Sequence, residues 1–553
     1  MAYARQFLGT TFAALAALIL AAPAIAAPIS DQAAVIYDPH SVAVIDLTLS
    51  PEAIADLEAE PAEYVKGTFS MATTSGGPEG TETPLTASPL PVEARLKGSG
   101  SFRPITGKAA FKFKFKKAEP FLGLRKMTLN NMVQDDSMVH EALSYLAFGA
   151  TEVQAPRSGY AYLRLNGEDV GLYADVETLD KVALEKRFGS FEAPPQHLYE
   201  GENGHDVLPG EAEFFEADEG EGEEWDDLEA VIEAVNGSGA EPWSTRVSPY
   251  ADLQEMTRMW AVEHYIAHWD GYAGHREAGM RPNNYYLFSE ASGRFQMLPW
   301  GTDQTWDLNL EIPHRIVSFD NEGGVMFNLC LEDDACRRLY WEALGKVTGA
   351  VEAIEPGDFL TSAAAMLTPW QQREREFGRP ERTAPQVEVA LDETAEFIAN
   401  RPAEARAWLA ANEPPAPEEG EEEGSGEEEP PQAPPVATSP PSGPSPAPGP
   451  PPGPRHLGRS KRAGNNLTLG IGLAGPASVR VLGTMGREGR RVVACKGSAE
   501  FIAGGRKEIV CALSPAALER LSDHALPLRL RVVIFPAASG REVLVRSIRL
   551  ARS

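Results

Sequence analysis

Cysteine is scarce in this sequence, with four residues in a chain of 553. The four fall into two local pairs, Cys330 with Cys336 and Cys495 with Cys511. Neither pair has the Cys-x-x-Cys spacing of a redox or zinc site, which argues against both kinds of site. Two short-range disulfides are the simplest interpretation, and buried reduced thiols are the alternative.

Basic residues are also in deficit, because 50 lysines and arginines face 80 aspartates and glutamates. The net charge of -30 repels a phosphate backbone, so nucleic acid is a poor partner. The deficit is uneven. From Arg455 to Ser553 there are 18 basic and 6 acidic residues, which leaves +12 on this segment and -42 on the preceding chain.

Long hydrophobic runs are missing after the first 26 residues. The N-terminus carries Arg5, a short apolar run from Thr11 to Ala22 and the small residues Ala24-Ile25-Ala26. This pattern is typical of a secretory signal peptide over residues 1–26. A membrane anchor is the alternative, but the run is shorter than the roughly 20 residues that span a bilayer. We therefore expect a secreted, periplasmic or cell-surface protein with no transmembrane segment after cleavage.

Residues 413–464, a segment with few apolar side chains to bury, separate two predicted domains. This segment contains the acidic run from Glu418 to Glu429 and 16 of the chain's 45 prolines. Such a composition predicts a solvated, disordered linker. The chain is thus expected to fold as a large domain over 27–412 and a small, basic domain over 465–553.

The small domain shows only strand patterns, which predicts an all-β sandwich or barrel. The expected strands are 467–473, 478–482, 491–494, 508–513, 526–535 and 542–550. Arginines alternate with apolar residues in Leu528-Arg529-Leu530-Arg531-Val532, as in a strand with one wet face. Such a basic face suits an anionic polymer or the chain's own acidic segment, although a solvated strand face is the simpler interpretation.

The large domain mixes both element types and is predicted to be α+β. Strand patterns cover 111–115, 161–165, 172–176, 285–288 and 295–298, and Asn166-Gly167 predicts a hairpin turn. Helical patterns cover 137–148, 179–188, 252–268 and 387–400, and a separate helix is expected at 403–411 after Pro402.

One glycine and serine loop, Lys97-Gly98-Ser99-Gly100-Ser101, precedes a strand with alternating phenylalanine and lysine. On a strand, Lys112, Lys114 and Lys116 share one face and the phenylalanines the other. A row of ammonium groups beside exposed backbone N–H groups is suited to a polyphosphate. The alternative is an edge strand whose lysines discourage aggregation.

Carboxylates and amides far apart in sequence form a second candidate group. Glu141 lies near the start of a predicted helix, Asp270 near the end of another, and Asn283 and Asn284 precede a hairpin that Asp303 follows. Phosphoryl transfer uses a carboxylate as the base, together with amide and carboxylate oxygens that bind Mg²⁺. The alternative is that these aspartates only cap a helix and a turn.

Several motifs of the sequence resemble those of a known family. The motifs Arg164-Leu165-Asn166-Gly167, Gly171-Leu172-Tyr173, Asn283-Asn284-Tyr285-Tyr286-Leu287 and Pro299-Trp300-Gly301-Thr302-Asp303, with Glu177, are similar to those of the CotH kinase family of atypical secreted or surface protein kinases. The resemblance spans roughly residues 46–311. It implies a reduced protein-kinase-like fold that binds ATP and Mg²⁺ and phosphorylates serine or threonine of envelope, coat or secreted proteins.

The resemblance also implies roles for the residues that match the family's nucleotide-binding motifs. The loop from Lys97 to Ser101 would cover the phosphates, although Ser99-Gly100 stands where the family usually has Asn-Ser. Lys112, with Lys114 as the competitor, would contact the α and β phosphates. Glu141 would hold that lysine in place.

Metal binding and proton transfer follow from the resemblance in the same way. Asp270 would orient the acceptor hydroxyl and take its proton, while Asn284 and Asp303, with Asn283 as the alternative to Asn284, would hold Mg²⁺. The family usually shows Pro-Trp-Asp-x-Asp, so Gly301 removes one candidate ligand. Since ATP is also scarce outside the cytoplasm, a non-catalytic surface scaffold or adhesion protein is the alternative function.

Two other kinds of metal site, for zinc and for calcium, are alternatives to this hypothesis. His264 and His268 share a helix face near His275, but Glu263 precedes the first histidine, unlike the order in zinc hydrolases. The acidic stretch 211–229 has no calcium-loop pattern. Packing histidines and a solvated acidic insertion are therefore preferred.

Overall fold

The computed structural model describes residues 31–189, 196–201, 204–220, 225–274, 282–307 and 318–415, and, with short gaps, the strands between 456 and 550. The expected signal peptide, 1–26, lies outside the described residues, and so does most of the expected linker, 413–464. The domain boundaries therefore stay predictions.

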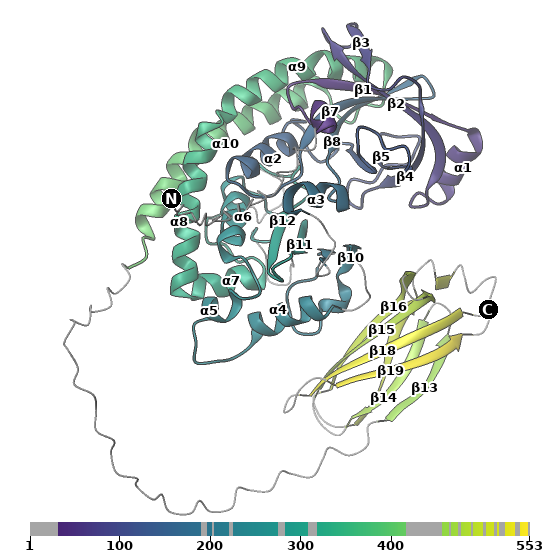
Figure 1. Ribbon diagram of the computed structural model, residues 1–553, viewed down its shortest axis with the longest axis vertical. Coiled ribbons are helices and arrows are strands. Elements are labelled where there is room, and N and C mark those ends of the chain that lie inside the picture. Colours follow the sequence, from purple (N-terminus) through teal and green to yellow (C-terminus); the bar gives the residue numbers. More distant parts are fainter. Residues whose placement is uncertain are drawn as a thin grey trace, which may run out of the picture.

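The first part of the chain builds an eight-stranded mixed sheet (Figure 1). Its strands are β1 (Val42–Leu49), β2 (Val65–Ser75), β3 (Thr81–Pro84), β4 (Leu90–Lys97), β5 (Ala110–Phe115), β6 (Lys126–Asn130), β7 (Ser158–Leu165) and β8 (Glu168–Val176). They lie in the order β1-β7-β8-β6-β5-β4-β2-β3, and β1 also pairs with β2, so the sheet closes on itself. The 3-10 helix η1 (Gln32–Val35) and helix α1 (Pro51–Ala59) belong to this region.

Strand β5 shows how the sequence sorts its two faces. Phe111, Phe113 and Phe115 are buried, whereas Lys112 and Lys114 are half-buried on the other side, which confirms the predicted alternation. β5 pairs with β4 on one side and β6 on the other, so the edge-strand alternative is wrong. The sheet thus has an aromatic face in the core and a polar face that is available for a site.

The hairpin between β7 and β8 confirms the predicted Asn166-Gly167 turn. Both residues have positive φ, 52° and 84°, as a two-residue type I′ turn requires. The Asn166 side chain also bonds the backbone N–H and C=O of Leu49 at 2.8 and 3.0 Å. The turn therefore fixes the end of β1 as well as its own hairpin.

A second, four-stranded sheet follows, in the order β10-β9-β11-β12. Its strands are β9 (Leu198–Glu200), β10 (Glu216–Glu219), β11 (Tyr285–Ser289) and β12 (Phe295–Pro299), and the helices of this region are α2 (His140–Ala150), α3 (Lys181–Phe188), η2 (Ala212–Phe214), α4 (Asp226–Asn236), α5 (Trp243–Val247) and α6 (Leu253–Tyr265). α6 packs against β12. The predicted strands 285–288 and 295–298 are confirmed as the antiparallel pair β11 and β12.

Helix α2 begins three residues later than the sequence indicated. Asp135 Oδ1 accepts hydrogen bonds from the backbone N–H groups of Ser137 and Met138, both at 2.9 Å, and Met138 has φ of 61°. This local turn competes with helical hydrogen bonding, so the first helical residue is His140. Glu141 nevertheless lies in the first turn, as expected.

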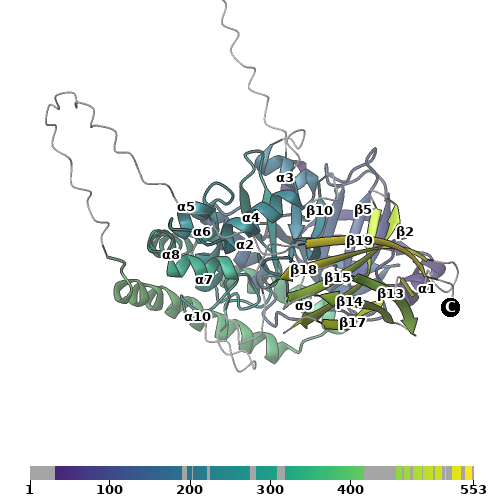
Figure 2. The same ribbon diagram turned by 90° about the horizontal axis from the view of Figure 1, so that it is seen from below.

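Four helices complete the large region: α7 (Val325–Glu332), α8 (Asp334–Ala353), α9 (Pro356–Phe377) and α10 (Ala384–Ala411). Helices α5 to α8 gather at one end of this region and strands β2 and β5 at the other (Figure 2). A disulfide between Cys330 and Cys336 joins α7 to α8, which confirms the first predicted pair. In the described part of the chain no helix is both long and apolar enough to cross a membrane.

The predicted helix break at Pro402 is wrong, because α10 continues through this proline. Proline removes one backbone donor and usually ends or kinks a helix. Here the preceding residue, Arg401, is buried and donates hydrogen bonds to the backbone oxygens of His264 and Tyr265, the latter at 2.9 Å. These contacts hold α10 against the end of α6 immediately before Pro402.

The C-terminal part forms one seven-stranded antiparallel sheet, in the order β13-β14-β17-β16-β15-β18-β19. The strands are β13 (His456–Ala463), β14 (Asn466–Leu473), β15 (Ala477–Arg487), β16 (Arg490–Phe501), β17 (Gly505–Leu513), β18 (Leu526–Pro536) and β19 (Glu542–Leu550). A disulfide links Cys495 to Cys511, which confirms the second predicted pair. All six predicted strands are present, whereas β13 falls inside the range expected as linker. The choice between a sandwich and a barrel stays a prediction.

Candidate active site

The glycine and serine loop begins where β4 ends, at Lys97. Gly98 has φ of 109°, a conformation that side chains disfavour, and a Cβ there would lie 2.8 Å from the Ser101 hydroxyl. The N–H of Phe102 donates to the Ser99 carbonyl at 3.2 Å, which closes a tight turn. The glycine therefore permits a sharp turn that leaves residues 98–100 exposed next to Lys97.

Lys97 and Glu141 are connected through a third residue. The Lys97 ammonium donates a hydrogen bond to Asn130 Oδ1, and Asn130 Nδ2 donates to Glu141 Oε1 at 2.7 Å. Asn130 ends β6 and Glu141 lies in the first turn of α2, so the chain of contacts joins the polar face of the sheet to a helix. Lys97 also lies 5.7 Å from the ring centre of Trp300.

The lysines of β5 have different neighbours from those expected. Lys112 interacts electrostatically with Glu200 on β9 and Asp218 on β10. Lys114 lies 3.8 Å from the ring centre of Tyr64. Within the described residues, no hydrogen bond or ion pair joins Lys112 to Glu141, whose basic neighbour is Lys97. Glu141 is thus connected to Lys97, and the roles predicted for Lys112 and Lys114 stay predictions.

Asp270 follows α6 in a short loop. Its Oδ2 accepts hydrogen bonds from Asn283 Nδ2 at 3.1 Å and Asn284 Nδ2 at 2.9 Å. Glu263 on α6 fixes the same loop, because its two carboxylate oxygens accept hydrogen bonds from the backbone N–H groups of Tyr272 and Ala273 at 3.0 and 2.7 Å. The structure thus brings together the three residues Asp270, Asn283 and Asn284 that the sequence analysis had selected.

Asp303 lies just beyond β12, in the segment that contains Gly301. Gly301 has φ of 55°, and a Cβ there would lie 2.5 Å from Asn284 Oδ1. His268, three residues after the end of α6, donates a hydrogen bond from Nε2 to the Gly301 carbonyl oxygen at 3.2 Å. This bond connects the Asp303 segment to the chain that follows α6. The Asp303 segment and the Asp270 loop are therefore held against each other by backbone and side-chain contacts.

The electrostatics confirm that the acidic groups are close together. Burial raises the pKa of Asp303, and the negative charges of Asp135 and Asp270 add to the shift, while Lys97 opposes it. Burial also raises the pKa of Glu141, and Asp303 adds to that shift. Burial lowers the pKa of Lys97, although Glu141 and Asp303 favour its charged form. Asp303 thus lies within electrostatic reach of Lys97, Glu141 and Asp270.

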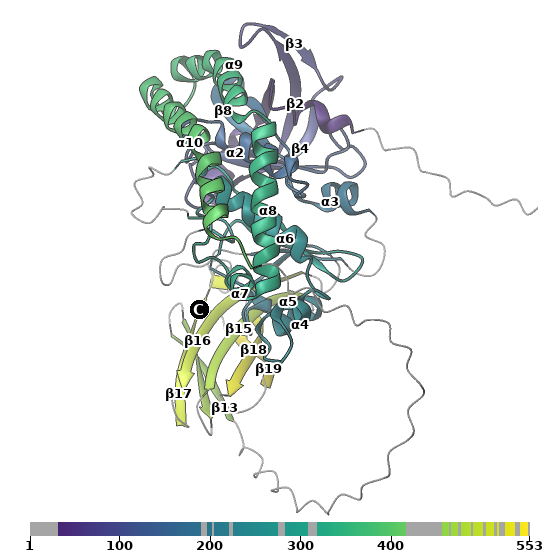
Figure 3. The same cartoon turned by 90° about the vertical axis from the view of Figure 1, so that its left-hand side faces the viewer.

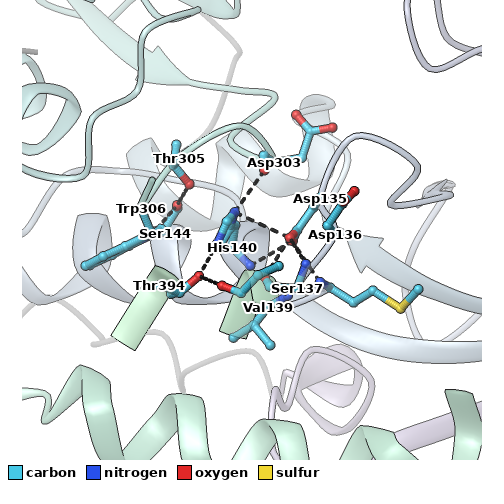
Figure 4. Close-up of polar contacts among 12 residues, drawn as sticks. Asp135, Asp136, Ser137, Val139, His140, Ser144, Asp303, Thr305, Trp306 and Thr394 are labelled. Atoms are coloured by element: carbon cyan, nitrogen blue, oxygen red, sulfur yellow. Dashed lines mark hydrogen bonds and ion pairs between the residues drawn. The ribbon is translucent and has the colours of Figure 1, made fainter. Parts of the chain in front are cut away.

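Several residues of this site were missed by the sequence analysis. Asn130 ends a strand without any motif, and Trp300 was read only as part of a family motif. His140 was not selected either, although its Nδ1 lies 3.3 Å from the Asp303 carbonyl oxygen and 3.3 Å from Asp135 Oδ1 (Figure 4). The one available signal was the position of His140 next to Glu141.

The zinc alternative finds no support. His264 Nδ1 contacts the Tyr340 hydroxyl at 2.9 Å, and burial lowers the pKa of His264 to about 3. His268 contacts Gly301 instead of facing His264, and His275 lies outside the described residues. The acidic stretch places Glu216 and Asp218 beside Glu200, with one carboxylate oxygen of each within 4.8 Å of the others, so this group could hold a metal ion and the calcium alternative stays open. Within the described residues, no group of three metal ligands contains a histidine.

Comparison with known proteins identifies the family of this chain. A family model described as CotH kinase protein matches residues 94–403, which is more than half of the chain. The chain is also 22% identical over 260 residues to the inner spore coat protein H of Bacillus subtilis (strain 168), a match that covers 45% of this chain and 69% of that protein. All the site residues described above lie inside the matched range.

Proposed function

Because this chain belongs to the CotH kinase family, we propose that it is a Mg²⁺-dependent atypical protein kinase that transfers the γ-phosphoryl group of ATP to serine or threonine of a protein partner. The proposal includes a reduced protein-kinase-like fold for the large region. The observation that carries it is the convergence of Lys97, Glu141, Asp270 and Asp303 from four separate segments. A lysine and carboxylates around one point are the groups that phosphoryl transfer uses.

Lys97 is the residue we assign to the α and β phosphates, in place of Lys112. Lys97 lies where β4 turns into the loop 98–101, which is exposed at 98–100 and whose backbone N–H groups would cover the phosphates. Glu141, acting through Asn130, keeps the ammonium in position. Lys112 is the competitor, and Lys114 is the weaker candidate because it packs on Tyr64.

The residues around Asp303 fit a magnesium ion. Asp303 offers a carboxylate, whose pKa is raised by burial and also by the negative charges of Asp135 and Asp270, and Asn284 offers an amide oxygen, Oδ1, next to Gly301. Oxygen donors of this kind are what Mg²⁺ prefers. Asn283 is the alternative to Asn284. A bound Mg²⁺ would neutralise the charge that develops on the phosphate oxygens.

Asp270 is assigned as the group that receives the acceptor's proton. The two amide donors on its Oδ2 fix the direction of the carboxylate. In the reaction the serine or threonine oxygen forms a bond to the γ phosphorus, the bond from that phosphorus to the bridging β–γ oxygen breaks, and ADP leaves. The hydroxyl proton passes to Asp270, so that no covalent enzyme intermediate is needed.

We further propose that the protein acts outside the cytoplasm on an envelope, coat or secreted protein. The signal-peptide pattern at residues 1–26 and the two disulfides support this, since disulfides persist in oxidising compartments. The name of the Bacillus subtilis relative supports a coat protein as one kind of partner. A non-catalytic kinase-like scaffold or adhesion protein is the second candidate, which the glycine at position 301 favours.

The experiment is incubation of the purified protein with labelled ATP, Mg²⁺ and a generic protein acceptor. Asp270→Asn and Asp303→Asn should each lower label transfer at least about a hundredfold, the scale of losing a catalytic group. Asp56→Asn, at an exposed position on α1, is the matched control and should transfer label like the wild type. Equal transfer by all four proteins would contradict the assigned roles. No transfer and no ATP binding by the wild type would favour the scaffold.

A further inference from the structure

Two long helices, α9 and α10, carry none of the assigned site residues but pack against segments that do. α9 and α10, with their connection 378–383, form a helical hairpin on one side of the large region (Figure 3). None of the residues assigned to ATP, Mg²⁺ or proton transfer lies on this hairpin. It nevertheless contacts both the β4–β5 loop, residues 98–109, and the segment around Asp303.

The first contact is a buried ion pair. Lys108 Nζ lies 2.7 Å from Glu374 Oε1, and both side chains are almost fully buried. The other Glu374 oxygen accepts from the N–H of Leu172 at 2.7 Å. Asn131 Nδ2 in turn donates to the carbonyl oxygens of Lys108 and Ser101 at 2.8 and 2.9 Å. Helix α9 thus anchors the loop close to the glycine and serine segment.

The second contact comes from the connection between the helices. Arg379 Nη1 donates to the carbonyl oxygens of Ile105 and Gly107 at 2.6 and 2.8 Å. Arg103 makes two hydrogen bonds with the Glu381 carboxylate, both at 3.0 Å. A loop has few backbone hydrogen bonds of its own, so contacts of this kind decide how far it moves.

The third contact leads to the Asp303 segment and is drawn in Figure 4. The Thr394 hydroxyl on α10 lies 2.7 Å from the Ala390 carbonyl oxygen and within hydrogen-bond distance of His140 Nε2, at 2.8 Å. The other ring nitrogen of His140 faces the Asp303 carbonyl oxygen at 3.3 Å. Thr394, His140 and Asp303 form a continuous path from the hairpin to the proposed metal ligand.

We propose that the α9–α10 hairpin is a positioning device, which sets the phosphate-covering loop and the Asp303 segment at a fixed separation. Glu374, Arg379 and Thr394 are its positioning residues; none touches the reacting atoms. The inference rests on the proposed function for its catalytic consequence, because the loop and Asp303 must grip the same nucleotide. Its structural part, the hold on the two segments, stands on the contacts alone.

The first test compares Thr394→Val with Thr394→Ser in the full chain. Valine has nearly the shape of threonine but no hydroxyl, whereas serine keeps the oxygen that His140 contacts. Loss of this hydrogen bond should lower kcat by about tenfold and raise the Mg²⁺ concentration needed for half-maximal rate, with KM for the protein acceptor unchanged. Thr394→Ser should restore both values. A valine variant that is less stable but equally active per folded molecule would overturn the inference.

The second test needs no activity and covers the case in which the valine variant does not fold. Hydrogen exchange is measured for Arg379→Gln, with Arg375→Gln in the last turn of α9 as the matched control. Arg379→Gln should speed exchange of the amides at 102–108 by about tenfold, and Arg375→Gln should leave them unchanged. Unchanged exchange in Arg379→Gln overturns the inference. Faster exchange in a chain that transfers no phosphate supports the hairpin's hold and contradicts only the proposed function.

Discussion

The sharpest prediction concerns which lysine serves the nucleotide. Lys97→Met and Lys112→Met remove one ammonium each from the same polar face of the sheet and keep most of the side-chain volume. Lys97 is connected to Glu141 through Asn130 and interacts with Asp303, whereas Lys112 is directed at Glu200 and Asp218. Only the first substitution therefore removes a cation from the catalytic group.

The size of the effect follows from the setting of Lys97. Loss of one partner of a buried, hydrogen-bonded charge pair costs about 2–5 kcal/mol. If the loss falls on the transition state, kcat/KM for ATP drops about thirtyfold to several thousandfold, since each ~1.4 kcal/mol is a factor of ten. Lys112→Met removes a charge that interacts with Glu200 and Asp218, which are not assigned to the nucleotide, and should cost about tenfold or less.

Initial rates of label transfer at varied ATP and Mg²⁺, together with calorimetric ATP binding, provide the assay. Lys117→Met, at an exposed position just after β5, controls for the substitution itself and should leave the rate unchanged. Lys97→Met is expected to stay folded, because burial already disfavours its charged form. A Lys112 variant damaged as severely as the Lys97 variant would refute the assignment of the phosphate-binding lysine.

Two further outcomes are expected. Gly301→Ala should lower label transfer at least tenfold, because the added Cβ would collide with Asn284. Gly293→Ala is the control: Gly293 has φ of 82° and open space around it, so the substitution should cost only about 1 kcal/mol of stability and leave the rate unchanged. Transfer rates and thermal midpoints are measured for both variants. Burial raises the pKa of Glu255 to about 8 from an ordinary 4.5. Between these pH values the folded chain holds a proton that the unfolded chain has lost, so this group's contribution to stability falls by about 1.4 kcal/mol per pH unit. Glu255→Gln, which keeps an acceptor for the Met297 N–H, should therefore match the wild type in urea at pH 5 and exceed it at pH 8; equal midpoints at pH 8 would contradict this.

Local patterns were sufficient for elements that depend on neighbouring residues. The alternation in β5 and the Asn166-Gly167 turn follow from strand geometry and from backbone preference, and both are confirmed. The expected stop at Pro402 failed because Arg401 is held by α6, which lies 136 residues away in sequence. A contact at such a distance leaves no trace in the residues around the proline.

The same limit explains the choice between Lys97 and Lys112. Both lysines occur in strands with apolar neighbours, and sequence spacing treats them alike. The distinction arises from the pairing of β4, β5 and β6, which puts Asn130 at the end of β6 within reach of Lys97 and leaves Lys112 opposite Thr128. Register between strands separated by long loops is decided by the packed structure, and a single sequence does not show it.

Glycine at position 301 has two consequences that act in opposite directions. It removes a carboxylate that the family usually has, which weakens the attraction for a cation. It also leaves room for Asn284, whose Oδ1 occupies the space where a side chain at 301 would begin. A neutral oxygen donor thus takes the place of a charged one while Asn284 still donates to Asp270 at 2.9 Å. The substitution therefore lowers the charge of the site without dismantling it, and activity is to be sought at elevated Mg²⁺ before the scaffold hypothesis is preferred.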